Sequence, residues 1–307
     1  MTKRFTGLGV ALITPFTEQG DLDFPGLERM VHHVAGSKAH FLVVLGSTGE
    51  AQLMSDEERR RVLDFVQEVN AGRLPIVAGF DTSGGTIAAV GRLRAIDTQG
   101  LDGLLMSAPA YIKPEQAGIL AHFQALSEAS PLPIILYNVP SRAGVAMSPD
   151  TIIEIANTCP QVVALKQAHD DLTDFRRIRQ GAPESFVLLS GDDANAIPMM
   201  ALGGEGLISV IGNAYPDAWA EALDLGVFGS VKEAEQHVAS HQPLMEVLFA
   251  EGNPTGIKAV CDLLGLCGPH PRLPLLPATP EHRDNLYRAM AHMDAVPQRS
   301  MGLSTDS

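Results

Sequence analysis

A lysine at the end of a short apolar run is the residue of this chain best placed to do chemistry. The run "VVAL" (162–165) leads directly into Lys166. Four consecutive apolar residues predict a strand that is buried on both faces. An amine held in such an apolar wall can attack a ketone and form a Schiff base. The alternative is a lysine at the rim of the fold, whose stem packs on apolar groups while the amine reaches water.

Residues with complementary chemistry follow other apolar runs. In "GSTGE" (46–50), the hydroxyls of Ser47 and Thr48 and nearby backbone N–H groups can cradle a carboxylate. Tyr137 offers a phenol for proton transfer, and Arg142 offers a planar fork that binds a carboxylate bidentately. Each also has an ordinary interpretation, as a turn with a helix cap, a core tyrosine or a loop cation.

Short apolar runs alternate with segments of helical periodicity along most of the chain. Helices are predicted over 55–72, where Ser55 is the expected N-cap, over 113–130 and over 148–160. Alternating strands and helices predict a parallel sheet, and eight repeats favour a (β/α)₈ TIM barrel over an open sheet. No GxGxxG motif follows the first run, which argues against a dinucleotide-binding fold. The eight predicted strands are 9–14, 41–46, 75–80, 102–109, 133–140, 162–167, 186–193 and 206–212.

The barrel prediction places the candidate residues together. Active sites of such barrels form at the carboxyl ends of the strands. Those ends carry "GSTGE", Tyr111, "YNVPSR" (137–142), Lys166 and "SGDD" (190–193). Taken jointly, an amine, a phenol, hydroxyls and a guanidinium on one face predict an imine-forming site for a carboxylated ketone.

The strand signals stop near residue 225. Helices are predicted over 232–252, 254–265 and 280–293, with a proline-rich stretch at 267–280. We therefore expect a barrel with the catalytic site over 1–225 and a C-terminal helical appendage, of a kind often used for assembly, over 226–295. Residues 296–307 are polar and are expected to form a disordered tail.

Composition excludes several other classes of function. The chain has 307 residues, 45% of them hydrophobic, and a formal net charge of -14, which argues against a nucleic-acid-binding surface. No run approaches the length of a membrane span, and the N-terminus lacks a signal-peptide pattern. Three cysteines without paired or metal-like spacing fit a reducing compartment. A cytoplasmic protein with small-molecule substrates is expected.

Several motifs in fixed order resemble those of the dihydrodipicolinate synthase and N-acetylneuraminate lyase superfamily. They are "GSTGE", "YNVPSR", the lysine after "VVAL", "SGDDA" (190–194) and "NPTGIK" (253–258), and the likeness extends from about residue 7 to 290. The resemblance implies a pyruvate-dependent class I aldolase on a (β/α)₈ barrel. It also implies a homodimer or a homotetramer built from tight dimers.

The resemblance implies a role for each candidate. Lys166 would form the imine with pyruvate, and Tyr137 would relay protons through Thr48 to Tyr111 of a neighbouring subunit. No metal or organic cofactor would be needed, because the imine nitrogen is itself the electron sink.

Substrate-binding roles follow from the same resemblance. Ser47 and Thr48 would hold the pyruvate carboxylate, Arg142 would bind the carboxylate of the incoming aldehyde, and the carbonyl of Ile208 would lie near the imine.

Arg142 is typical of the synthase branch, whose second substrate is aspartate semialdehyde and whose product is 4-hydroxy-tetrahydrodipicolinate, on the route to diaminopimelate and lysine. The chain departs from that branch at Ser47, usually a threonine, and at Gln167, usually a glutamate. Two alternatives stay open: an aldolase or dehydratase acting on sialic or keto-deoxy sugar acids, and a catalytically silent barrel that senses a keto acid.

Feedback inhibition by lysine is expected to be weak or absent. Lysine-inhibited synthases carry a second tyrosine before the interface tyrosine and a glutamate early in the helix after the third strand. Here Ala110 precedes Tyr111, and the stretch 83–90 contains no acid. An ammonium buried there without a carboxylate partner would be costly.

Overall fold

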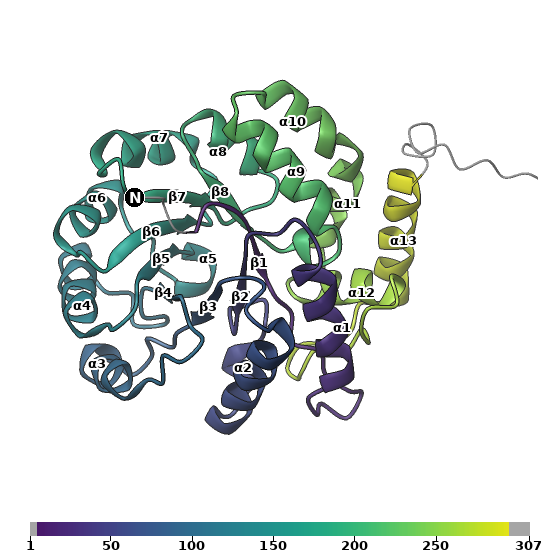
Figure 1. The fold of residues 1–307 in the computed structure, drawn as a ribbon, viewed down its shortest axis with the longest axis horizontal. Coiled ribbons are helices and arrows are strands. Elements are labelled where there is room, and N and C mark those ends of the chain that lie inside the picture. The colour runs from purple at the N-terminus through teal and green to yellow at the C-terminus, as the bar shows by residue number, and fades with distance from the viewer. Residues whose placement is uncertain (1–4, 295–307) are drawn as a thin grey trace, which may run out of the picture.

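The computed structural model describes residues 5–294, and its centre is a closed barrel of eight parallel strands (Figure 1). Each strand pairs with its neighbours in chain order, and β1 closes the barrel on β8. The predicted fold class and all eight predicted strands are confirmed. The strands are β1 (Gly7–Ala11), β2 (Phe41–Val44), β3 (Ile76–Gly79), β4 (Gly103–Ser107), β5 (Ile134–Asn138), β6 (Val162–Gln167), β7 (Val187–Ser190) and β8 (Gly206–Ser209).

Helices surround the barrel, and the last ones extend to one side of it (Figure 1). Three short 3₁₀ turns, η1 (Ala51–Leu53), η2 (Ile211–Asn213) and η3 (Ala239–His241), interrupt the series. The α-helices are α1 (Phe24–Ala35), α2 (Asp56–Asn70), α3 (Gly85–Ala95), α4 (Gln116–Ala129), α5 (Pro140–Ala143), α6 (Pro149–Thr158), α7 (Leu172–Gly181), α8 (Ala196–Ala201), α9 (Pro216–Val227), α10 (Val231–Val238), α11 (Gln242–Leu248), α12 (Thr255–Leu263) and α13 (Pro280–Asp294).

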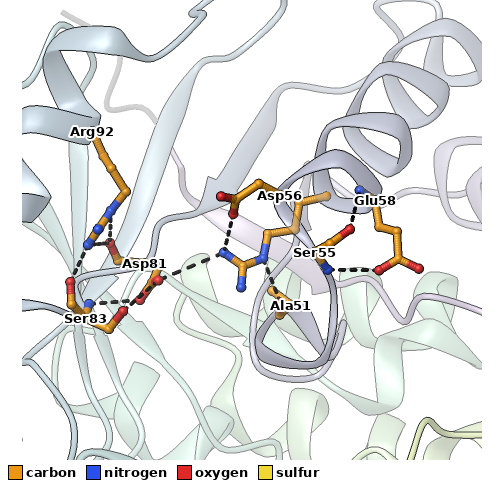
Figure 2. Close-up of polar contacts among 8 residues, drawn as sticks. Ala51, Ser55, Asp56, Glu58, Asp81, Ser83 and Arg92 are labelled. Carbon is orange, nitrogen blue, oxygen red and sulfur yellow. Dashed lines mark hydrogen bonds and ion pairs between the residues drawn. The ribbon is translucent and has the colours of Figure 1, made fainter.

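Local sequence explains where several helices begin and end. Ser55 caps α2 as predicted: its side chain accepts from the Glu58 N–H, while the Glu58 carboxylate accepts from the Ser55 N–H (Figure 2). The single helix expected over 232–252 is wrong, because the structure divides it into α10, η3 and α11. Pro243 lies in the first turn of α11, where a proline is tolerated. In the interior of one long helix the same proline would lack the N–H for a backbone hydrogen bond and would clash with the preceding turn.

Side chains of the strands alternate between two apolar layers. One buried cluster lies inside the barrel and includes Ile135, Ala164 and Ile208. The other, larger cluster lies between the strands and the helices and includes Leu136 and Leu165. Because side chains on a strand alternate with a period of two, the residues two positions after Ile135 and Ala164 also face the interior. Those residues are Tyr137 and Lys166.

The C-terminal helices pack against strands of the barrel and against one another. Helix α9 contacts β1 and β8, α10 contacts α9, and α13 contacts α11 and α12. The division of the chain at residues 225 and 226 stays a prediction, and residues 296–307 lie outside the described residues. No helix between residues 5 and 294 is long and apolar enough to cross a membrane.

Candidate active site

Lys166 and Tyr137 lie side by side within the barrel. The two residues are directly paired in the β5–β6 ladder. The Lys166 side chain lies over the phenol, with Nζ 4.4 Å from the centre of the Tyr137 ring. Lys166 is only 3% exposed. The alternative of a rim lysine with its amine in water is therefore wrong.

The environment of Tyr137 favours its ionised form. Burial alone would raise the pKa of Tyr137, but the charge of Lys166 and a hydrogen bond with the Ser47 side chain lower it. The charge of Arg142 and a hydrogen bond with Lys166 act in the same direction, and the net effect is a pKa below the ordinary value. A phenol poised in this way can give up and take back a proton more readily than a tyrosine in water.

The loop after β2, which carries Ser47 and Thr48, brings the Ser47 hydroxyl to Tyr137 through an unusual backbone path. Leu45 and Glu50 both adopt the left-handed conformation, with φ of 60° and 56°. A non-glycine residue in this conformation costs on the order of 1–3 kcal/mol and persists only where the surrounding structure enforces it. The loop also requires a glycine at position 79 on the neighbouring strand, because a Cβ there would lie 2.0 Å from the Leu45 carbonyl oxygen. The loop is therefore pressed closely against β3.

Thr48 is buried, and its hydroxyl is held from the other end of the chain. The Nδ2 of Asn253 donates to Thr48 Oγ1 at 2.9 Å. Thr14 Oγ1, in the segment after β1, donates to the carbonyl of Gly49 at 2.8 Å and holds the same loop. Asn253 belongs to the motif "NPTGIK", but no local pattern links it to Thr48, which is 205 residues away.

A buried ion pair anchors the end of the same loop. The carboxylate of Glu50 pairs with Lys258, which is fully buried, and also accepts from the backbone N–H of Arg272 at 2.8 Å. Lys258 Nζ donates to the carbonyl of His270 at 3.0 Å and lies 4.4 Å from the ring centre of Phe16. Burial lowers the pKa of Lys258 although the charge of Glu50 opposes this effect. The segment 253–258 thus contacts the loop at two points.

Arg142 lies on α5, a single helical turn after β5, and is exposed. Its Nη2 donates to the carbonyl oxygen of Asn253 at 3.2 Å. Part of the guanidinium fork is thereby fixed, and Arg142 faces the same cavity as Tyr137 and Ser47. The structure brings these predicted residues to one place.

The cavity has a volume of about 350 Å³, within the range of ordinary small-molecule sites. Its polar lining includes Ser47, Tyr137, Arg142 and Asn253. Lys166 is not among the lining residues, but its amine lies 4.4 Å from the ring centre of Tyr137, which is one of them.

A charged cluster that sequence reasoning missed contributes Arg59 and Asp81 to the cavity lining. Figure 2 shows the polar contacts of this cluster. Arg59 donates to the carbonyl of Ala51 at 2.8 Å and lies 3.9 Å from the carboxylate of Asp81. Burial would raise the pKa of Asp81, but hydrogen bonds from Ser83 and the charges of Arg92 and Arg59 lower it. Arg59 lies in the charged, helix-like run 55–72, where nothing marks one arginine as facing inward.

Two predicted residues are placed differently from the rest. Tyr111 follows β4, is 94% exposed, and does not line the cavity, although its neighbour Ala110 does. Within one chain Tyr111 is therefore not brought to Lys166. Ile208 lies on β8 with its side chain in the interior cluster, and the role of its carbonyl stays a prediction.

Gln167 does not reach the site. It follows the inward-facing Lys166, so its side chain faces the helices, where its Oε1 accepts from Asn138 Nδ2 at 3.0 Å. Asn138 in turn bonds the backbone of Met147, accepting from its N–H at 3.0 Å. Gln167 thus braces β5 and β6 from outside, on the face opposite to Lys166.

The "SGDD" motif also has a supporting place in the structure. Asp193 is buried, accepts a hydrogen bond from the Ser209 hydroxyl, and accepts from the backbone N–H of Val210 at 3.1 Å. Burial raises the pKa of Asp193 to about 6 in spite of these hydrogen bonds. It fixes the turn after β8. Between residues 5 and 294, no group of three or more His, Cys, Asp or Glu side chains is arranged to hold a metal ion.

Several known proteins resemble this chain in sequence and in fold. The 4-hydroxy-tetrahydrodipicolinate synthase of Flavobacterium psychrophilum is 38% identical over 275 residues, which is 89% of this chain and 92% of that protein. The crystal structure of dihydrodipicolinate synthase from Aquifex aeolicus matches with a TM-score of 0.90 and 35% identity, covering 94% of this chain and 98% of the other. The lysine-bound enzyme from Cyanidioschyzon merolae gives a TM-score of 0.90 and 35% identity, over 95% and 99% of the two chains. The sequence model of the dihydrodipicolinate synthetase family matches residues 4–293, and the chain belongs to this family.

Proposed function

We propose that the chain condenses pyruvate with L-aspartate 4-semialdehyde to give 4-hydroxy-tetrahydrodipicolinate, a step toward diaminopimelate and lysine. The observation that carries this proposal is the pairing of a buried amine, Lys166, with the phenol of Tyr137 beside a cavity that also presents Arg142. The names of the relatives support the same reaction.

In the proposed reaction Lys166 Nζ adds to the ketone carbon of pyruvate, and water leaves as the imine forms. Tyr137 supplies and removes the protons of this step. Loss of a methyl proton gives an enamine, whose carbon bonds to the aldehyde carbon while the aldehyde oxygen takes up a proton. The amine of the extended chain then attacks the imine carbon, and Lys166 leaves as the ring closes.

Two carboxylate clamps would orient the substrates. Ser47 and Thr48 hold the pyruvate carboxylate close to Lys166, and Ser47 also contacts Tyr137. Arg142 binds the carboxylate of the aldehyde substrate, a planar fork to a planar anion. The reaction as proposed requires no metal or organic cofactor, because the positively charged imine nitrogen accepts the electrons.

A second copy of the chain would complete the site. Tyr111 has the chemistry of a relay residue, yet it lies on the surface of its own chain. We propose that it reaches the site of a neighbouring copy in a homodimer or homotetramer, where it continues the relay from Thr48. We also propose a cytoplasmic location, which suits the three free, buried cysteines.

Borohydride reduction in the presence of pyruvate tests the imine. A pyruvate adduct is expected on Lys166 and should be absent in Lys166→Ala, whereas Lys232→Arg, a change at an exposed lysine, should leave it intact. Absence of the adduct in the unmodified protein would overturn the proposal.

Condensation with aspartate semialdehyde, measured beside retro-aldol cleavage of sialic and keto-deoxy sugar acids, then tests the substrate. Faster cleavage of a sugar acid would assign the chain to the rival activity.

A further inference from the structure

Asn253 connects two parts of the site and has no assigned role. Its side chain donates from Nδ2 to Thr48 Oγ1 at 2.9 Å. Its backbone carbonyl accepts from Arg142 at 3.2 Å, and the residue lines the cavity. Its Oδ1 is buried and, among the described residues, has no hydrogen-bond partner. One residue thus contacts both the relay threonine and the carboxylate fork.

The hydrogen-bonding capacity of a hydroxyl makes the side-chain contact informative. A threonine hydroxyl has one donor and two acceptor positions. A proton relay through it uses the donor and one acceptor, which leaves one acceptor position to fill. The amide NH₂ of Asn253 fills that position and cannot itself accept a proton. An acceptor in its place would instead compete for the single O–H of Thr48.

We propose that Asn253 is a positioning residue that sets the direction of the Thr48 hydroxyl, so that its proton is always available to the relay. This inference rests on the proposed function, in which Thr48 passes protons between Tyr137 and a second tyrosine. Asn253 does not touch the reacting atoms, and it acts through the orientation of Thr48.

The supports of Asn253 fit this role. Five residues further on, Lys258 pairs with Glu50, which lies two residues after Thr48. The segment 253–258 and the loop 46–50 are therefore joined at two points, one at each end of the segment. Such a double attachment keeps the amide at a fixed distance from the hydroxyl, and a fixed distance is what a directional hydrogen bond needs.

Two substitutions distinguish a role of Asn253 in orienting the Thr48 hydroxyl from a role in packing alone. Asn253→Asp keeps the shape but replaces the donor by a carboxylate that accepts from Thr48, whereas Asn253→Ala removes the contact and leaves the hydroxyl free to turn. The measurement is exchange of solvent deuterium into the methyl group of pyruvate without any aldehyde, which reports enamine formation alone. Asn157→Asp, at an exposed position of α6, is the matched control.

We expect Asn253→Ala to slow the exchange modestly. The exchange rate of Asn253→Asp should be lower than that of Asn253→Ala by at least about tenfold, which is a fraction of the rate factor that a positioned acid or base contributes to catalysis. Lowering the pH should narrow the gap, because a protonated carboxyl regains an O–H donor for Thr48. Borohydride trapping on Lys166 should persist in both variants, and Asn157→Asp should exchange at the original rate.

A purely structural role predicts the reverse order, since aspartate preserves the packing and alanine does not. Exchange in Asn253→Asp that equals or exceeds that of Asn253→Ala at neutral pH would overturn the inference while leaving the imine chemistry intact. A gap between the two variants that does not change with pH would overturn it as well. Failure of trapping in the unmodified protein is a different result, which removes the proposed function and the relay together.

Discussion

Lys166 and Tyr137 occupy facing positions on adjacent strands, and the lysine amine lies 4.4 Å from the centre of the phenol ring. Both residues belong to barrel strands rather than to loops. The charge of Lys166 is also one of the causes that lower the pKa of Tyr137. Position and acidity of the phenol therefore depend on the same neighbour.

Replacing the phenol by phenyl should disable proton transfer without emptying the site. We expect Tyr137→Phe to reduce kcat by roughly 10²- to 10⁴-fold, the usual contribution of a positioned acid or base. The pyruvate imine should still form, more slowly, and remain trappable by borohydride. Steady-state kinetics and mass spectrometry check this, with Tyr287→Phe, an exposed tyrosine on α13, as the control. An unchanged kcat would remove Tyr137 from the relay.

Arg142 should matter for the second substrate more than for the first. Loss of a charge-assisted, bidentate contact costs roughly 1.5–3 kcal/mol. We therefore expect Arg142→Ala to lower kcat/KM for aspartate semialdehyde by about 10- to 100-fold, with pyruvate-methyl exchange changed far less. Arg142→Lys should recover only part of the loss, because an ammonium lacks the planar fork. Arg176→Ala, at an exposed position of α7, is the comparison. Equal effects on both substrates would contradict the assignment.

Sharing of Tyr111 between copies predicts complementation. Tyr111→Phe and Lys166→Ala should each be nearly inactive alone. Mixed and re-associated, they should regain activity, since the intact lysine of one copy then meets the intact tyrosine of the other. Size-exclusion chromatography with light scattering should show at least a dimer. A monomer with full activity would contradict this arrangement.

Glu58 should contribute stability only above a certain pH. Its hydrogen bond with Arg272 is the main cause that lowers its pKa from 4.5 to about 2. Because the folded-state pKa lies below the unfolded one, the contribution is complete above about 4.5 and declines as the pH falls toward about 2. Glu58→Gln should therefore melt at a lower temperature at pH 7, with the difference narrowing below pH 4.5. Glu57→Gln, exposed on the same turn, should show no such trend.

Lysine should inhibit weakly or not at all. Ala110 directly precedes Tyr111 and lines the cavity, and the stretch 83–90 offers no carboxylate for an ammonium. Initial rates measured with increasing lysine are expected to stay constant through the sub-millimolar range. Clear inhibition there would show that another group supplies the missing contacts.

The sequence could predict the barrel because each strand signal is local. Runs such as 162–167 carry their own pattern, and the barrel rule then places their ends on one face. The alternation of side chains along a strand likewise places Gln167 on the face opposite to Lys166. What local patterns cannot predict are contacts between distant segments. Asn253 and Thr48 are 205 residues apart, and no periodicity relates them.

The buried pair of Glu50 and Lys258 changes how the C-terminal region should be regarded. Residues 253–258 support the proposed catalytic site, because they contact the loop that carries Ser47 and Thr48 at two points. All eight barrel strands precede residue 253 in the chain, so the loop after β2 depends on a segment that follows the complete barrel sequence. A barrel truncated after residue 225 would keep the loop that carries Ser47 and Thr48 but would lack the contacts of Asn253 and Lys258 with that loop.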